Sequence, residues 1–142
     1  MQASTRPFLR ALLPLTLLAA AAGAAAATVE VHVTGVMAGK GKVNVAVCDR
    51  ERFLKQCAYS ASAPAREGDN VVRIADVPAG NWAVLAYQDE NANDELDRNI
   101  VGIPKENYGF SRDARGRFGP PGFDDAAIEV RGEVTQAAVK LR

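Results

Sequence analysis

Apolar residues alternate with polar ones through much of the chain after residue 27, which is the pattern of β-strands with one buried face. Valines occupy every second position of residues 28–34 and again of residues 43–47. Glycines lie between these two segments, so the sequence predicts that they form a hairpin. His32 falls on the solvent side of the first strand, which is typical of an ordinary surface histidine.

Residues 49–74 predict a helix, a loop and a third strand in turn. Asp49 is of a type that caps helices, and residues 50–56 place apolar side chains on one face at helical spacing. Residues 61–70 are small, polar and proline-containing, which predicts a loop. The third strand is expected over residues 71–74.

The later segments complete an all-β pattern. Residues 82–87 are apolar on both faces, which predicts a central strand covered on each side. Residues 128–130 and 134–141 flank a Gly-Glu turn and predict a final hairpin. Six or seven short strands with almost no helix predict a two-layer antiparallel sandwich, immunoglobulin-like or transthyretin-like, with a small barrel as the alternative.

The first 27 residues differ from the rest of the chain. Two arginines precede an apolar, alanine-rich run that ends in small residues before Thr28, which is the pattern of a cleaved secretory signal peptide. A membrane anchor is the alternative, but the apolar run is short for a bilayer about 30 Å thick. We therefore expect a signal peptide over residues 1–27 and one domain over residues 28–142, located in the periplasm or secreted.

Charge argues against two classes of partner. The whole chain carries 17 basic and 17 acidic residues, and loss of Arg6 and Arg10 with the signal peptide gives a formal net charge of −2. Such a chain has no overall field for nucleic acid or anionic lipid. No transmembrane segment is expected after cleavage.

Cys48 and Cys57 are the only two cysteines. An exported chain meets an oxidising compartment, where such a pair usually forms a disulfide. A redox dithiol is the alternative, but it usually needs a Cys-x-x-Cys spacing. The pair is therefore predicted to close a short structural loop.

The stretch Asp89–Asp97 holds oxygen-bearing side chains at every second residue. This spacing suits Ca²⁺, which takes carboxylate, amide and carbonyl oxygens from one loop, although the EF-hand glycine and the final glutamate are missing. The alternative is that Asp and Asn gather here because their side chains bond to backbone groups in turns. The predicted ligands are Asp89, Asn91, Asn93, Glu95 and Asp97.

Residues 89–122 form a long segment with no strong strand or helix pattern. Loops of this length are uncommon in compact domains unless they are functional or disordered. The segment from Gly102 to Phe123 is too apolar for a solvated linker, so we expect it to be ordered against the sandwich. A recognition surface is then expected at Lys105, Glu106, Tyr108, Phe110 and Ser111.

Several segments together resemble the family of small exported bacterial proteins known as domain of unknown function 2141. The segments that carry the resemblance are Gly80–Val84, Asp89–Asp97, Gly102–Glu106, Tyr108–Ser111 and Pro120–Phe123. The match covers almost all of residues 28–142 and rests on the combination. The resemblance implies an exported β-sandwich of unassigned activity, and it supplies no catalytic residue.

Function is open between three classes. A binding module would present the long loop to an envelope, peptide or glycan partner. A small glycan-active enzyme would instead use Asp89, Asp97 and Glu106 as paired carboxylates, with Trp82 or Tyr108 as a sugar platform. A chain this short leaves little room for a cleft, so binding or a structural accessory role is favoured over catalysis.

Overall fold

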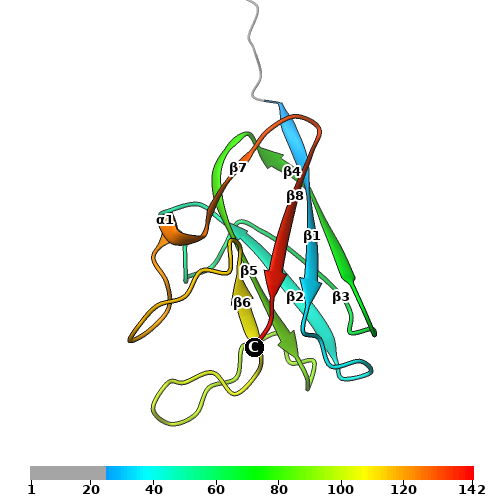
Figure 1. Ribbon diagram of the computed structural model, residues 1–142, viewed down its shortest axis with the longest axis vertical. Helices are drawn as coiled ribbons and strands as arrows, with labels where there is room; N and C mark the ends of the chain where they lie inside the picture. The colour runs from blue at the N-terminus through cyan, green and yellow to red at the C-terminus, as the bar shows by residue number, and fades with distance from the viewer. Residues whose placement is uncertain (1–24) are drawn as a thin grey trace, which may run out of the picture.

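The computed structural model describes residues 25–142 and has two β-sheets packed face to face, which confirms the predicted sandwich (Figure 1). The elements are β1 (Ala26–Thr34), β2 (Lys42–Cys48), β3 (Tyr59–Pro64), β4 (Asn70–Pro78), β5 (Gly80–Asp89), β6 (Tyr108–Phe110), α1 (Phe123–Ala126), β7 (Ala127–Val130) and β8 (Val134–Lys140).

The smaller sheet has the strand order β4-β1-β8 and the larger sheet β3-β2-β5-β6, with β7 also paired to β5. All strand pairs are antiparallel except β1 with β8, which run parallel. The two sheets also meet along one side, where Tyr108 and Arg142 exchange backbone hydrogen bonds of 3.1 Å. A Cβ at Gly109 would lie 2.2 Å from the carbonyl oxygen of Lys140, so this junction requires glycine.

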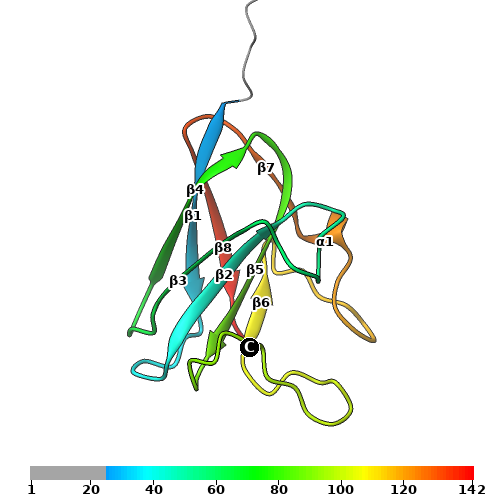
Figure 2. The same ribbon diagram turned by 180° about the vertical axis from the view of Figure 1, so that it is seen from behind.

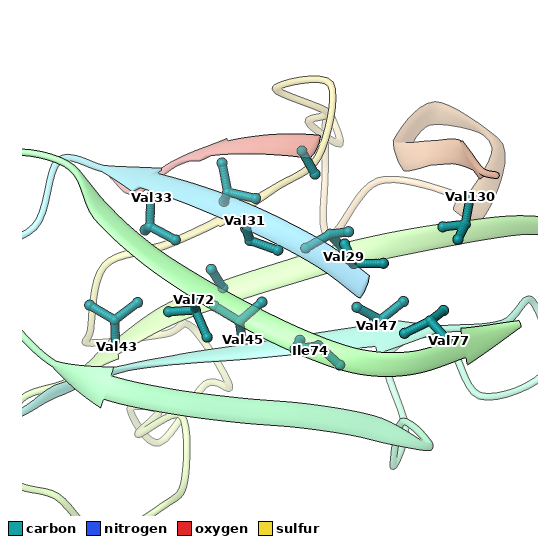
Figure 3. Packing of buried hydrophobic residues seen from close by; sticks show 14 of the residues in the cluster. Val29, Val31, Val33, Val43, Val45, Val47, Val72, Ile74, Val77 and Val130 are labelled. Atoms are coloured by element: carbon teal, nitrogen blue, oxygen red, sulfur yellow. The ribbon is translucent and has the colours of Figure 1, made fainter. Parts of the chain in front are cut away.

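Valines fill the space between the sheets. Those of β1 and β4 point toward those of β2 on the facing sheet (Figure 3). Val29, Val31, Val33, Val43 and Val47 are all fully buried. Burial of one such side chain contributes about 1.5 kcal/mol or more, so the alternating valines stabilise the fold and fix the register of each strand.

Neither predicted hairpin forms. β1 and β2 lie in different sheets, and β7 pairs with β5 while β8 pairs with β1. The prediction was wrong because a period-two pattern shows which face of a strand is buried but not which strand lies beside it. In both cases the connection between the strands crosses from one sheet to the other.

The segment between the cysteines and β4 also differs from prediction. Residues 50–56 form turns with no helix, and Leu54 has a left-handed backbone (φ 61°) that a helix cannot accommodate. Residues 59–64, predicted in large part as loop, form the strand β3. Alanine and serine alternate in β3, but they are too similar in size for the alternation to be recognised as a strand pattern.

The disulfide between Cys48 and Cys57 is present, with a Cα–Cα distance of 4.8 Å. It ties the end of β2 to the turn that precedes β3. The closed loop is short, so the chain-entropy model gives a stabilisation a little under ~3 kcal/mol.

Gln88 is a fully buried polar side chain at the end of β5. Its amide nitrogen donates to the carbonyl oxygens of Met37 and Lys40, each at 2.7 Å, and its amide oxygen accepts from the N–H of Met37 at 2.8 Å. Gln88 therefore holds the connection between β1 and β2 against the end of the larger sheet.

His32 lies on the outer face of the smaller sheet between two carboxylates. Its Nδ1 is 2.7 Å from Asp69 and its Nε2 is 3.1 Å from Glu30, which also accepts from Arg73. The hydrogen bond to Asp69, with a smaller contribution from Glu30, raises the pKa of His32 above its usual value of 6.5. The prediction of a surface histidine is thus confirmed, and His32 belongs to a small cluster of charged side chains.

We expect His32 to stabilise the fold at acidic pH. Because its pKa is higher in the folded than in the unfolded chain, the stabilisation is fully present below about 6.5 and is lost as pH rises through the folded-state pKa. The effect should stay below ~1 kcal/mol because the site is partly exposed. Unfolding free energies of the wild type and of His32→Gln, measured from pH 5 to 9, should converge as pH rises; a constant difference would contradict this.

No helix within residues 25–142 is long and apolar enough to cross a membrane. The predicted signal peptide lies outside the described residues except for its last three. Ala26 and Ala27 belong to β1, and Ala27 is buried.

Candidate functional site

Asp89 organises the loop that follows β5. Its side chain is fully buried, and its two carboxylate oxygens accept the backbone N–H groups of Asn93 at 3.0 Å and Asp94 at 2.8 Å. The Nδ2 of Asn44 lies 3.3 Å from the same carboxylate, and the ammonium group of Lys42 lies 4.0 Å away. This carboxylate therefore acts as the anchor of the turn.

The other Asx residues of the loop bond to one another. The side-chain oxygens of Asn91 and Asn93 accept backbone N–H groups two residues further on, and their amide groups donate to Asp97. Ala92 and Asp94 have left-handed backbones (φ 56° and 65°), as tight turns require. The turn chemistry proposed as one alternative is confirmed.

Glu106 closes the loop from the other side. It is buried, and its two carboxylate oxygens accept the N–H groups of Glu90 at 2.9 Å and Asp97 at 3.0 Å. The chain thus folds back so that residues 89–97 lie between two carboxylates, Asp89 and Glu106. Backbone N–H groups stabilise the negative charges of these two buried carboxylates, which have no equally buried positive side chain beside them in the described chain.

The loop does not gather side chains in the manner of a metal centre. Among the described residues there is no group of three or more His, Cys, Asp or Glu side chains arranged to hold a metal ion. The oxygens of Asp89, Asn91 and Asn93 already accept hydrogen bonds, so a cation has to compete with the turn for them. Calcium binding here stays a prediction.

The five residues of the predicted recognition surface divide into two groups. Lys105 is exposed, and Tyr108 is 37% exposed. Glu106, Phe110 and Ser111 are buried, so they offer little surface to a partner. The Ser111 hydroxyl bridges β5 and the end of α1, accepting the N–H of Val84 and donating to the carbonyl of Ala126.

The apolar residues of the long segment also divide. Phe110 and Phe123 pack with Phe53 in a second, smaller core outside the larger sheet. Ile103 and Phe118 are 59% and 103% exposed, so the expectation that they pack on the sandwich was wrong.

A groove lies on the outer face of the larger sheet. The segment between β5 and β6 and the segment between β6 and α1 project on the same side of the molecule, as both ribbon views show (Figures 1 and 2). They form its walls, and the outward side chains of β2, β3, β5 and β6 form its floor. Its volume is about 1320 Å³, larger than a typical small-molecule site.

The groove gathers most of the large apolar side chains that are exposed. Five of the seven in the described chain line it: Leu54, Val101, Ile103, Tyr108 and Phe118. The groove could not be predicted beyond the apolar content of residues 96–118, because its two walls and the turn at Leu54 are far apart along the chain.

Tyr87 and Asn44 contribute polar groups to the floor. Asn44 Nδ2 donates to the Tyr87 hydroxyl at 2.9 Å, and burial raises the pKa of Tyr87 above its usual value. Asp94 on the wall pairs with Lys42. The floor can therefore offer hydroxyl and amide groups beside apolar surface.

The paired-carboxylate arrangement of the enzyme alternative finds no geometric support. Asp89 and Glu106 are buried and accept backbone N–H groups, which commits their oxygens to the loop. Trp82 donates its indole N–H to Pro78 and packs against Tyr59, away from the groove.

The comparisons with known proteins place the chain in one family. The family model described as an uncharacterized protein conserved in bacteria (DUF2141) matches residues 31–138. No curated protein and no solved structure matches the chain. Since that model covers well over half of the chain, from β1 into β8, this protein belongs to the DUF2141 family of bacterial proteins.

Proposed function

We propose that this protein is an exported binding module that holds a partner in the groove on the outer face of its larger sheet. The observation that carries the proposal is the gathering of five exposed large apolar side chains around one concave surface. Monomeric proteins rarely leave such a surface uncovered unless it binds something. The walls are loops on a rigid sandwich, the usual arrangement for recognition.

Export to the periplasm or the medium is supported by the signal-peptide pattern of residues 1–27 and by the disulfide. Cleavage before Thr28 would remove Ala26 and Ala27 from β1, and Thr28, whose N–H donates to Glu133 at 2.8 Å, would begin the strand. Cell fractionation and the intact mass of the recovered protein test this. A full-length chain in the cytoplasm would contradict export.

Site-specific crosslinking tests the groove. A photoreactive benzoylphenylalanine at Phe118 is expected to give a covalent adduct of defined mass in the cells that make the protein. The same group at Val134, which is 57% exposed but lies outside the groove, is the matched control and should give none. No adduct at position 118, or the same adducts at both positions, would overturn the proposal.

Calcium stabilisation of the Asp89–Asp97 loop is a separate prediction. With a dissociation constant near ~0.1 mM, as in extracellular modules, ~1 mM calcium would stabilise the fold by about 1.4 kcal/mol. Magnesium should do less because it demands tighter geometry. Asp97→Asn should remove the rise in melting temperature, whereas equal melting curves in calcium and in chelator would leave the hydrogen-bonded turn as the whole explanation.

A further inference from the structure

We propose that the occupant of the groove is an extended polypeptide segment in which acidic residues alternate with apolar ones. The inference rests on the proposed function and specifies its partner. It is argued from the charges around the groove, from its size and from the chemistry of its floor.

Two of the three charged side chains that line the groove are positive, and neither of these two is neutralised by an acid within the described residues. Lys55 and Arg98 line it, and both donate to backbone carbonyls, of Glu51 and Gly102 respectively. Neither makes an ion pair within residues 25–142, whereas the acidic lining residue Asp94 is paired with Lys42.

The walls carry charges of both signs. Residues 90–107 and 111–122 together hold five basic and six acidic residues, of which Glu106 is buried and bonded to backbone, and Asp94 and Asp113 form ion pairs. Glu90, Glu95 and Asp97 do not line the groove. Lys105 and Arg117 are exposed and have no acidic partner in the described chain. Of the charged side chains that line the groove, those without an ion pair in the described chain are Lys55 and Arg98, and their positive charges complement an anionic partner.

The size and shape of the groove favour a chain segment. Its volume of about 1320 Å³ exceeds that of most small-ligand sites, and it is partly open to solvent. The apolar side chains stand on both walls, with Val101 and Ile103 on one and Phe118 on the other. A chain lying between them can place apolar side chains against the walls and acidic ones toward the basic groups.

The floor supplies hydrogen-bonding groups that a peptide backbone needs. Ser60 and Ser62 point outward from β3 beside Asn44 of β2, and all three line the groove. Peptide N–H and C=O groups must be paired when they leave water. An anionic bilayer surface would meet the same basic residues, but a bilayer offers no partners to a polar, recessed floor.

Affinity selection tests the inference. The full-length mature protein is immobilised and offered three pools of dodecapeptides with apolar residues at alternate positions. The positions between them hold Asp or Glu in the first pool, Lys or Arg in the second, and Ser or Thr in the third. Recovery of the acidic pool should exceed that of the neutral pool by about tenfold and fall as salt rises, because exposed charges are screened.

Variants of the groove separate charge from apolar contact. The double variant Lys55→Gln/Arg98→Gln should bring recovery of the acidic pool down to that of the neutral pool. Phe118→Ser should lower the recovery of all three pools. Arg131→Gln and Val134→Ser, exposed positions outside the groove, are the controls and should change neither result. Circular dichroism confirms that each variant is folded.

The outcomes distinguish this inference from the proposed function. Equal recovery of the three pools, or a preference for the basic pool, would overturn the inference. If crosslinks still form at position 118 in that case, the proposed function as a binding module is upheld, and the partner has a different chemistry. Binding to phosphatidylglycerol vesicles that the same variants abolish, with no selection of the acidic pool, would assign a lipid surface instead. Self-association lost in Phe118→Ser, again without selection, would assign a second copy of the chain.

Discussion

Asp89→Ala is expected to lower the free energy of unfolding by about 3 to 5 kcal/mol, with or without calcium. The substitution removes a fully buried carboxylate that accepts two backbone N–H groups, of Asn93 and Asp94. Each charge-assisted bond contributes about 1.5 to 3 kcal/mol, and the N–H groups left behind lose their partners. Urea denaturation followed by circular dichroism measures the change.

Asp94→Ala is the matched control. The Asp94 side chain is 73% exposed and its carboxylate pairs with Lys42, so the loss should stay below about 1 kcal/mol. Asp89→Asn should fall between the two, because the amide keeps one acceptor oxygen. An Asp89→Ala variant as stable as the wild type would show that the loop holds its shape without this anchor.

Gln88→Leu is expected to destabilise the fold by about 2 to 4 kcal/mol, although the substitution nearly preserves volume. The loss arises because the Met37 N–H and the carbonyls of Met37 and Lys40 lose the one side-chain partner that they have within residues 25–142. An unpaired buried group costs about 1 to 3 kcal/mol, partly relieved here where water reaches the connection. The melting temperature should fall by about 10 °C.

Gln136→Leu provides the comparison, since Gln136 is exposed on β8 and makes no side-chain hydrogen bond in the described chain. Its effect should lie within about 0.5 kcal/mol. Equal effects of the two substitutions would mean that the connection between β1 and β2 is held by its backbone alone.

Two buried groups in the middle of the chain thus fix two loops at the same end of the larger sheet. Gln88 and Asp89 are adjacent, and successive residues of a strand point to opposite faces. Gln88 faces the interior and holds the connection after β1, whereas Asp89 faces outward and holds the wall of the groove. The last two residues of β5 therefore couple the core to the candidate site.

The local patterns in the sequence were sufficient for the strands with strong alternation. The valines of β1 and β2 and the apolar run in β5 identified those elements and the faces that they bury. Strand β3 was not predicted, because alanine and serine differ too little in size and polarity to show which face of a strand is buried. Residues 50–56 carried a helical pattern, but the turn with a left-handed Leu54 prevailed.

The sequence also identified the Asx-rich loop and the cysteine pair. Both depend on residues close together in the chain, where spacing alone limits what the side chains can reach. The sequence could not show that Glu106 accepts the N–H group of Glu90 and so closes that loop. The two residues are distant along the chain and meet only because the segment between them turns back. The same holds for Ser111, whose hydroxyl is committed to β5 and α1 rather than to a surface.

The sequence by itself determined the strands with strong alternation, their buried faces and the composition of the long loop, because these follow from side-chain chemistry at neighbouring positions. Only the tertiary structure decided which strands pair, that β1 and β8 run parallel, and that Leu54, Val101 and Phe118 line one groove. Those features depend on how distant segments pack once the valine core has formed, and a local pattern carries no information about a partner distant in sequence.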